Sequence, residues 1–241
     1  MLNYHSYESF STQDGPWIRM VFFLQWCPFR CLYCQNPDTI STDKNKQISK
    51  EKILRLVYKE KEYFWEDWWV TFSWWECLLQ IKELIPTLKL LKENWINTCL
   101  DTNGFLLNDD VKEALKYTDH VLPDIKGMTP ELHKKITWTS NLTPLDFIHY
   151  IDEQWMNYRI RYVVVPWLTD NEIDIKNLWK FVQSLKNFQK INLLPYHTMA
   201  IEKRKKLWRK YPLEWTPAAT NDDIQKVKET LKNYIDEKSI Q

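Results

Sequence analysis

The sequence predicts an α/β fold built from six successive strand–helix units. Short apolar runs alternate along the chain with longer segments in which apolar residues recur at helical spacing. This alternation is typical of a parallel sheet with helices packed outside it. A chain of 241 residues is long enough to bury the core of one such domain. We therefore expect a single domain over residues 1–241.

The predicted strands and helices follow one another in regular order. The first strand is a nearly continuous apolar run, as expected of a strand buried on both faces. One helix is expected to begin after Thr143 as its N-cap, with a proline at the first helical position. The full prediction is strand 18–25, helix 46–64, strand 70–73, helix 78–93, strand 96–101, helix 109–117, strand 121–125, helices 130–136 and 144–153, strand 159–165, helix 172–185, strand 190–194 and an amphipathic helix from 222 to about 235.

Three cysteines follow the first predicted strand directly. Cys27, Cys31 and Cys34 are spaced so that a single loop can bring their thiols to one point, and thiolates suit an iron–sulfur cluster or zinc. A structural zinc site or an electron-carrier [4Fe–4S] site normally takes four protein ligands. The remaining cysteines, Cys77 and Cys99, lie elsewhere and are read as small core residues. A cluster held by three thiols leaves one iron open, and we expect the chemistry there.

Polar motifs follow most of the predicted strands. In a parallel α/β barrel, ligands bind at the carboxyl ends of the strands. The motifs therefore predict one active site, without reference to any known protein. They are the cluster loop at 26–39 after the first strand, residues 74–76 after the second, 101–104 after the third, 124–126 at the fourth and 195–197 after the sixth.

Composition narrows the class of protein. The 33 basic and 32 acidic residues are nearly balanced, which argues against a nucleic-acid-binding stripe. We find no run of eighteen apolar residues and no secretory signal pattern, so we expect a cytoplasmic protein without a membrane partner. Five cysteines, three of them clustered, fit a reducing compartment better than a disulfide scaffold.

The tryptophan content is abnormal. The chain has three glycines and fourteen tryptophans, whereas glycine usually makes up about 7% of a protein. The tryptophans also stand where a chain needs glycine: Trp95 lies between a predicted helix and a strand, the usual place of a C-cap glycine, and Trp167 follows Pro166 in a turn. Together the two residue types make up about the ordinary glycine fraction.

We expect that most or all of these tryptophans stand for glycine. One cause would be a gene that uses UGA for glycine, translated with a table that reads UGA as tryptophan; deliberate substitution is the rival cause. A third interpretation is that all fourteen are genuine aromatic residues of the core. It conflicts with adjacent pairs such as Trp68-Trp69 and Trp74-Trp75. The distinction matters because glycine permits positive φ and close approach of a ligand, whereas an indole would fill that volume.

The cysteine motif resembles the signature of the radical S-adenosylmethionine (SAM) enzymes. Its flanking residues resemble the glycyl-radical-enzyme activases of that superfamily, in which glycine stands at the positions of Trp17, Trp26, Trp74 and Trp75. The resemblance extends from about Tyr4 to Pro217 and implies a partial (β/α)6 radical SAM barrel. It is carried by Cys27-x-x-x-Cys31-x-x-Cys34, Asp14-Gly15-Pro16, Cys34-Gln-Asn-Pro-Asp-Thr39 and Asp101-Thr-Asn-Gly104.

The resemblance implies a role for each candidate residue. On residue type alone, these side chains also suit loop carboxylates, helix caps, a surface lysine or a structural histidine. The family pattern implies a [4Fe–4S] cluster on Cys27, Cys31 and Cys34, SAM beside Tyr33, Trp74, Trp75, Glu76, Lys126 and His197, a monovalent cation on Asp101, Thr102 and Asp124, and substrate contact at Asp14.

The activity implied by the resemblance is activation of a glycyl-radical enzyme. In the family, the reduced cluster cleaves SAM to methionine and a 5′-deoxyadenosyl radical, which abstracts hydrogen from a backbone glycine of the partner. The expected electron donor is flavodoxin or ferredoxin, the protein is expected to be a monomer, and the physiology is anaerobic. Activases for other partners commonly carry an inserted segment with two more cysteine clusters. This chain has none, which favours pyruvate formate-lyase as the partner.

Two other functions remain open at this point. A radical SAM enzyme acting on a small molecule, such as a deazaguanine synthase, would need no protein substrate. A non-catalytic three-cysteine metal or electron-transfer protein would fail to bind or cleave SAM. The basic segment 203–210 is more typical of a solvated face than of a docking site.

Overall fold

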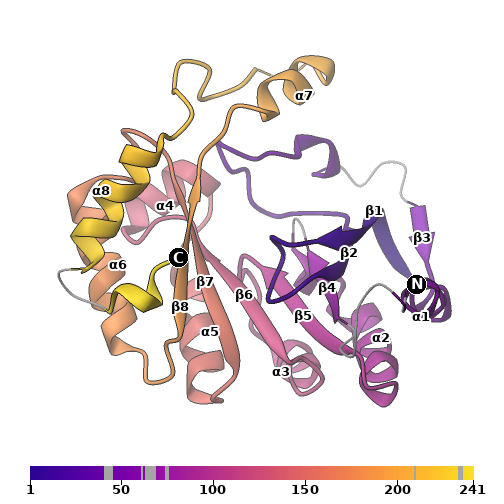
Figure 1. The fold of residues 1–241 in the computed structure, drawn as a ribbon. Helices are drawn as coiled ribbons and strands as arrows, with labels where there is room; N and C mark the ends of the chain where they lie inside the picture. Colours follow the sequence, from indigo (N-terminus) through magenta and orange to yellow (C-terminus); the bar gives the residue numbers. More distant parts are fainter. Residues whose placement is uncertain (41–45, 61, 63–68, 74–75, 209, 233–235) are drawn as a thin grey trace. The chain divides into compact units, whose positions relative to one another are not determined.

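The computed structural model describes residues 1–241 apart from 41–45, 61, 63–68, 74–75, 209 and 233–235 (Figure 1). It divides into two compact units. Unit 1 comprises residues 1–28 and 39–122, and unit 2 comprises residues 29–38 and 123–241. Among the described residues, no helix has the length and apolar character needed to cross a membrane. That the whole chain is one domain stays a prediction.

Unit 1 is built on a mixed sheet with its strands hydrogen-bonded in the order β3-β1-β2-β4-β5. β2, β4 and β5 run parallel, and β1 runs antiparallel to both β2 and β3. Every residue of β2 is buried, because both faces of the parallel part are covered. The bounds are β1 Leu2–Ser11, β2 Arg19–Leu24, β3 Lys46–Ile48, β4 Trp69–Ser73 and β5 Asn97–Thr102.

The helices of unit 1 start at side-chain caps. Ser49 accepts a hydrogen bond from the Lys52 N–H ahead of α1, and Asn108 accepts one from the Val111 N–H ahead of α3, which satisfies N–H groups that have no partner within the helix. The helical segments are α1 Lys50–Lys59, the 3-10 turn η3 Cys77–Gln80, α2 Ile81–Glu93 and α3 Asp109–Leu115.

Unit 2 contains the parallel strands β7 and β8, and β6 carries the chain into it. Along β7, buried residues alternate with partly exposed ones, the period expected of a strand with one face on a core. The bounds are β6 His120–Ile125, α4 Pro130–Thr137, α5 Leu142–Glu153, β7 Asn157–Val164, α6 Glu172–Ser184, β8 Lys190–Pro195, α7 Ala200–Lys206 and α8 Asn221–Lys232, with short 3-10 turns η1 at Pro37–Thr39 and η4 at Glu237–Ser239.

A buried carboxylate joins α5 to the segment after α6. Asp152 is 3% exposed and accepts hydrogen bonds from the Tyr158 hydroxyl at 2.7 Å, the Lys186 N–H at 2.8 Å and the Asn187 N–H at 2.7 Å. Three donors compensate its removal from water. Burial, followed by the contact with Asp152, raises the pKa of Tyr158.

All six predicted strands are present as β2, β4, β5, β6, β7 and β8. The helix predicted over 46–64 is wrong at its start, because residues 46–48 form β3, and part of its end lies outside the described residues. The N-cap predicted at Thr143 is also wrong: α5 begins two residues earlier, with Asn141 in the N-cap position. The prediction missed β1 and α7 altogether.

Among the described residues, four helix ends are occupied by tryptophan in the left-handed conformation. Trp95 has a φ of 59° and Trp155 a φ of 55°, each in the C′ position directly after the C-cap of α2 and α5. Both ends form Schellman motifs, with the next residue's N–H bonded to the third carbonyl from the helix end: Ile96 to Leu91 at 3.0 Å, and Met156 to Ile151 at 3.1 Å. Glycine is the residue usually found at such positions.

Candidate active site

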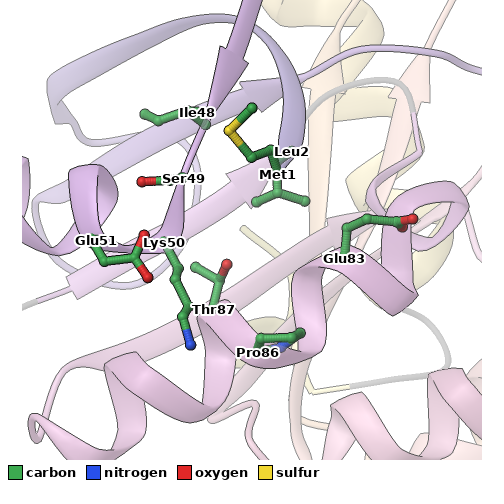
Figure 2. A pocket seen from close by; sticks show the side chains of 9 residues that line it. All are labelled: Met1, Leu2, Ile48, Ser49, Lys50, Glu51, Glu83, Pro86 and Thr87. Carbon is green, nitrogen blue, oxygen red and sulfur yellow. The ribbon is translucent and has the colours of Figure 1, made fainter.

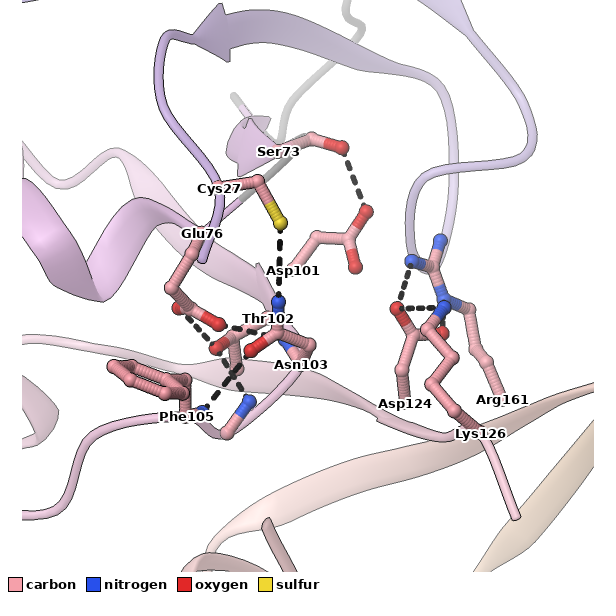
Figure 3. A network of polar contacts seen from close by, with 11 residues as sticks. Cys27, Ser73, Glu76, Asp101, Thr102, Asn103, Phe105, Asp124, Lys126 and Arg161 are labelled. Atoms are coloured by element: carbon pink, nitrogen blue, oxygen red, sulfur yellow. Dashed lines mark hydrogen bonds and ion pairs between the residues drawn. The ribbon is translucent and has the colours of Figure 1, made fainter. Parts of the chain in front are cut away.

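A buried carboxylate connects the ends of β4 and β5 in unit 1 (Figure 3). Glu76 is fully buried, and its Oε1 accepts hydrogen bonds from the Leu78 N–H at 3.0 Å and the Thr102 hydroxyl at 2.5 Å. Its Oε2 accepts the Asn103 N–H at 3.0 Å. Burial raises the pKa of Glu76 to about 7, although these hydrogen bonds oppose the shift. The motif after β5 is therefore fixed to Glu76.

The same motif reaches the first cysteine. The Asn103 side-chain amide lies 3.6 Å from the Cys27 Sγ and donates toward it, and Asp101 accepts a hydrogen bond of 2.6 Å from the Ser73 hydroxyl. An amide donor beside a thiolate is a typical outer-shell contact of a metal-binding cysteine. Cys27 and the 101–104 motif thus belong to one network in Figure 3.

In unit 2, a second network surrounds Asp124 at the end of β6 (Figure 3). Its carboxylate is paired with the Lys126 Nζ at 2.9 Å and the Arg161 Nε at 3.2 Å. Burial alone would raise the pKa of Asp124, but the two cations outweigh it and the pKa lies below its usual value. Burial opposes protonation of Lys126, yet Asp124 raises its pKa. The two charges of Lys126 and Arg161 against one carboxylate leave this site net positive.

The cluster loop in unit 2 is fixed by backbone hydrogen bonds to the end of α4. The Arg30 N–H donates to the Thr137 carbonyl at 2.9 Å and the Leu32 N–H to the Ile136 carbonyl at 3.0 Å. The loop is also joined to the end of β8, because the Gln35 amide donates to the His197 carbonyl at 2.9 Å. These contacts position the two later cysteines of the motif.

Cys31 and Cys34 are adjacent within that loop. The Cys34 N–H donates to the Cys31 carbonyl at 3.1 Å. Burial raises the pKa of Cys31 to about 12 and also raises that of Cys34, so a thiolate is favoured there only with a cation bound to it. Tyr33 lies between them, with the Lys126 Nζ 5.9 Å from its ring centroid.

The predicted site residues divide between the units. Unit 1 holds Asp14, Cys27, Glu76, Asp101 and Thr102; unit 2 holds Cys31, Tyr33, Cys34, Asp124, Lys126 and His197. Trp74 and Trp75 lie outside the described residues. Within either unit, no three Asp, Glu, His or Cys side chains of the described residues form a metal-binding group. Convergence of the three thiols, and of the three cation ligands, stays a prediction.

Asp14 is placed differently from the other candidates. It precedes β2, whereas the cluster loop follows that strand. Its carbonyl accepts a hydrogen bond of 2.8 Å from the Thr71 hydroxyl, and its carboxylate accepts one from Ser11. Its assignment to the substrate therefore stays a prediction.

Sequence reasoning missed three residues that contact the site. Asn103 and Gln35 stand inside motifs that carried the resemblance, but no role was given to either. Arg161 could not be oriented from the sequence, since a charged residue in an alternating strand fits either face; the structure pairs it with Asp124.

A surface pocket of about 290 Å³ in unit 1 is separate from these residues (Figure 2). Met1, Ile48, Glu51 and Thr87 are among its lining residues, and no predicted site residue lines it. We do not assign it to the active site.

Comparison with known proteins places the chain in a superfamily. The model of the radical SAM superfamily matches residues 21–178, which is more than half of the chain. The chain therefore belongs to the radical SAM superfamily, as the cysteine motif and fold indicated. Its partial TIM-like barrel class is confirmed by this match and by the solved structures described below.

Curated relatives narrow the family further. The chain is 39% identical over 233 residues to the pyruvate formate-lyase-activating enzyme of Clostridium pasteurianum, a match covering 96% of this chain and 98% of the relative. It is 35% identical to the pyruvate formate-lyase 1-activating enzyme of Escherichia coli strain K12, covering 95% of each. Within the superfamily, its family is that of the pyruvate formate-lyase-activating enzymes.

Solved structures agree with this assignment. A domain of the pyruvate-formate lyase-activating enzyme from Bacteroides vulgatus matches with a TM-score of 0.57 at 26% identity, covering 68% of this chain and 93% of that one. Streptococcus suis SuiB bound to S-adenosylmethionine matches with a TM-score of 0.64 at 14% identity, covering 88% of this chain and 45% of that one. The second match shows the fold alone.

The described residues fit the cofactors that the superfamily implies. The Tyr33 hydroxyl and the His197 Nδ1 are both buried and have no hydrogen-bond partner among the described residues. Buried polar atoms are usually hydrogen-bonded, so these two atoms are available to a polar ligand. Together with the amide donor at Cys27 and the half-buried thiols of the motif, they are suited to an iron–sulfur cluster and a polar small molecule.

Proposed function

We propose that the chain activates pyruvate formate-lyase by placing a radical on a backbone glycine of that enzyme. The observation that carries the proposal is 35–39% identity, over nearly the whole chain, to enzymes named for this activity. The three-cysteine motif and the polar residues after the strands support it.

The proposed cofactors are a [4Fe–4S] cluster on Cys27, Cys31 and Cys34, and SAM at the open iron. When bound, they supply reductive cleavage of SAM and a 5′-deoxyadenosyl radical that takes a hydrogen atom from the partner's glycine. The protein's part is to hold SAM and the glycine and to exclude water.

Each unit contributes groups suited to SAM. Glu76 is a buried carboxylate suited to the methionine amino group, and positions 74 and 75, which lie outside the described residues, are assigned to SAM with it. In unit 2, Tyr33 offers an aromatic face for the adenine, and His197 has a buried Nδ1 without a partner among the described residues. Lys126 and Arg161 together carry one positive charge more than Asp124, which favours the SAM carboxylate there.

The remaining assignments are less direct. We propose that Asp101, Thr102 and Asp124 hold a monovalent cation near the SAM carboxylate, although Lys126 and Arg161 already occupy the Asp124 carboxylate. Asp14 is assigned to the glycyl loop of the partner. Flavodoxin or ferredoxin supplies the electron, and the protein acts as a monomer in the cytoplasm.

Anaerobic reconstitution with iron and sulfide tests the cofactor assignment. With dithionite as reductant, we expect 5′-deoxyadenosine and methionine in equal amounts. Cys31→Ala should lose iron and all SAM cleavage. Cys77→Ala removes a buried thiol outside the motif and is the matched control; its iron content should match that of the parent. The same assay would be run on the chain with glycine in place of the tryptophans. If that chain binds a cluster but cleaves no SAM, the result would instead indicate a non-catalytic metal protein.

A further inference from the structure

The backbone singles out tryptophan among all residue types. Every non-glycine residue with positive φ in the described part of the chain is a tryptophan, with φ between 55° and 80°. Left-handed backbone is uncommon for residues other than glycine, is enriched among Asn, Asp and His, and is a genuine outlier for bulky residues. No described Asn, Asp or His adopts it here. The seven residues are Trp17, Trp26, Trp95, Trp138, Trp155, Trp167 and Trp208.

Four of these positions end helices. Trp95, Trp138, Trp155 and Trp208 follow α2, α4, α5 and α7, and each N–H bonds back into the last turn of its helix: to Lys92 at 3.0 Å, Lys134 at 2.8 Å, Asp152 at 3.0 Å and Lys205 at 2.9 Å. This is the geometry of αL and Schellman caps, for which glycine is the preferred residue.

The indole rings at the four helix ends contribute little packing. Trp95 is 94% exposed and Trp208 is 97% exposed, and Trp138 and Trp155 are 70% and 69% exposed. A large apolar side chain is normally retained for the area it buries. Here the backbone is strained for a side chain that leaves most of its surface exposed, so packing does not explain the residue type.

We infer that these seven positions are glycine in the native protein, and that tryptophan appears because glycine codons were read as tryptophan. Extending the reassignment to all fourteen tryptophans would bring glycine, now three residues, to about the ordinary fraction of 7%. At Trp26 it gives the cluster loop a flexible entry next to Cys27. By extension it applies to positions 74 and 75, which lie outside the described residues, where glycine would let a ligand approach the backbone.

Peptide mass spectrometry of the protein from its native host tests this inference. We expect glycine in the peptides that contain positions 95, 155 and 208, with UGA at those codons in the gene. Tryptophan at these positions would overturn the inference, whatever the activity of the protein. Glycine encoded by ordinary glycine codons would overturn the codon explanation. The tryptophans would then be deliberate substitutions for glycine.

A second, independent observation concerns α7. Four of its seven residues are basic and one is acidic, in a chain whose net charge is only +1. Lys205 and Lys206 are exposed. Such residues at a helix C-terminus also complement the helix dipole, but a dipole requires neither this concentration of charge nor the contacts described next.

The helix is attached directly to the cluster loop within unit 2. The Arg204 Nη2 donates to the Cys31 carbonyl at 3.2 Å, and the Lys203 Nζ donates to the Asn36 side chain. Ala200 packs in the same buried cluster as Tyr33, against which Cys31 also packs. The exposed lysines therefore lie on a helix that directly contacts the loop carrying Cys31 and Cys34.

We propose that the exposed face of α7 docks the electron donor, a carrier protein with an acidic surface such as flavodoxin. The proposal rests on the proposed function, because only a redox cluster needs such a donor. One electron passes from the reduced flavin to the cluster, so the flavin is oxidised by one electron. Complementary charge speeds encounter and orients the partner, and its effect falls with salt.

Charge reversal on α7 tests the docking surface. Lys205→Glu/Lys206→Glu should slow SAM cleavage driven by purified flavodoxin roughly tenfold at low salt, with the dithionite-driven rate unchanged. The control is Lys180→Glu/Lys226→Glu, which makes the same charge change on exposed residues of α6 and α8; it should leave both rates near those of the parent.

Three results would overturn the docking proposal. An unchanged flavodoxin-driven rate would mean that the donor docks elsewhere. An equal fall in the dithionite-driven rate would mean that the lysines act on the cluster loop itself. Loss of activation of pyruvate formate-lyase with both reductants, at an unchanged rate of SAM cleavage, would make α7 a contact for the protein substrate. Failure of the proposed function is distinct, since the parent would then cleave no SAM with dithionite.

Discussion

Replacing the tryptophans at two helix ends by glycine should stabilise the protein. Trp95 and Trp155 both sit in the C′ position of Schellman motifs with φ near 60°, where a residue with a Cβ pays about 1–2 kcal/mol. Glycine loses about 0.5–1 kcal/mol more through backbone entropy than alanine does. Trp95 is 94% exposed and Trp155 69% exposed, so little burial is lost.

The net gain is about 0.5–1 kcal/mol for each position. Trp95→Gly/Trp155→Gly should thus gain about 1–2 kcal/mol in free energy of unfolding, and its melting temperature should rise by about 2–8 °C for a chain of this size. Differential scanning fluorimetry of the apo-protein under reducing, anaerobic conditions measures the shift.

A matched pair of alanine variants separates the backbone effect from removal of the indole. Trp95→Ala/Trp155→Ala also deletes both rings but keeps the Cβ, so it should gain far less than the glycine variant. Trp179→Gly replaces a tryptophan inside α6, where φ is not positive, and should lower the melting temperature. Equal melting temperatures for the glycine and alanine double variants would refute the reasoning.

Three further predictions follow from buried groups. His133 is 1% exposed, and burial lowers its pKa to about 4. The unfolded state therefore binds more protons than the folded state between about pH 4 and 6.5, and the free energy of unfolding should fall by up to about 3 kcal/mol as the pH drops through that window. Chemical unfolding of His133→Gln should show a smaller loss of stability over the same range. Asp152→Ala should cost about 3 kcal/mol in unfolding free energy, against about 1 kcal/mol for Tyr158→Phe. Only the former leaves three donors without their acceptor: the buried Tyr158 hydroxyl and the part-buried N–H groups of Lys186 and Asn187. Similar values for both variants would contradict the network. Glu76→Gln should retain iron but cleave SAM at least roughly tenfold more slowly, since one charge-assisted hydrogen bond is worth about 1.5 kcal/mol or more; parent-like turnover would remove Glu76 from the site.

The sequence was sufficient to predict the parallel strands because their signal is strong. β2 is buried throughout and has a nearly continuous apolar sequence after Arg19. The alternation of strand and helix patterns predicts the other parallel strands. The weaker elements were missed for a physical reason. β1 is mostly half-buried, so its apolar pattern is diluted, and β3 is a short edge strand with exposed polar residues, as edge strands commonly are.

The sequence supplied candidate residues for the site, whose membership stays a prediction, but not their contacts. Spacing identified Cys27, Cys31 and Cys34, and position after a strand identified Glu76. What no pattern could give was the pairing of Arg161 with Asp124, or the attachment of α7 to the cluster loop through Arg204. Those depend on which way a side chain points, which period-two and period-3.6 patterns do not specify for isolated charged residues.

The tryptophans also show which features of the backbone the sequence predicts and which it does not. Composition and local sequence indicated that Trp95 occupies a C-cap position, and the backbone confirmed it. The sequence patterns placed the helix ends before Trp138 and Trp155 to within one residue without assigning either a left-handed conformation, and they missed α7, which ends before Trp208.

The central claim is most directly tested by electron paramagnetic resonance of the partner enzyme. The glycine-containing chain, reconstituted anaerobically, would be incubated with pyruvate formate-lyase, SAM and a reductant. The account predicts a glycyl-radical signal that grows with time, requires SAM and is absent with Cys31→Ala. SAM cleavage without any radical on pyruvate formate-lyase would contradict the account and point to a different substrate.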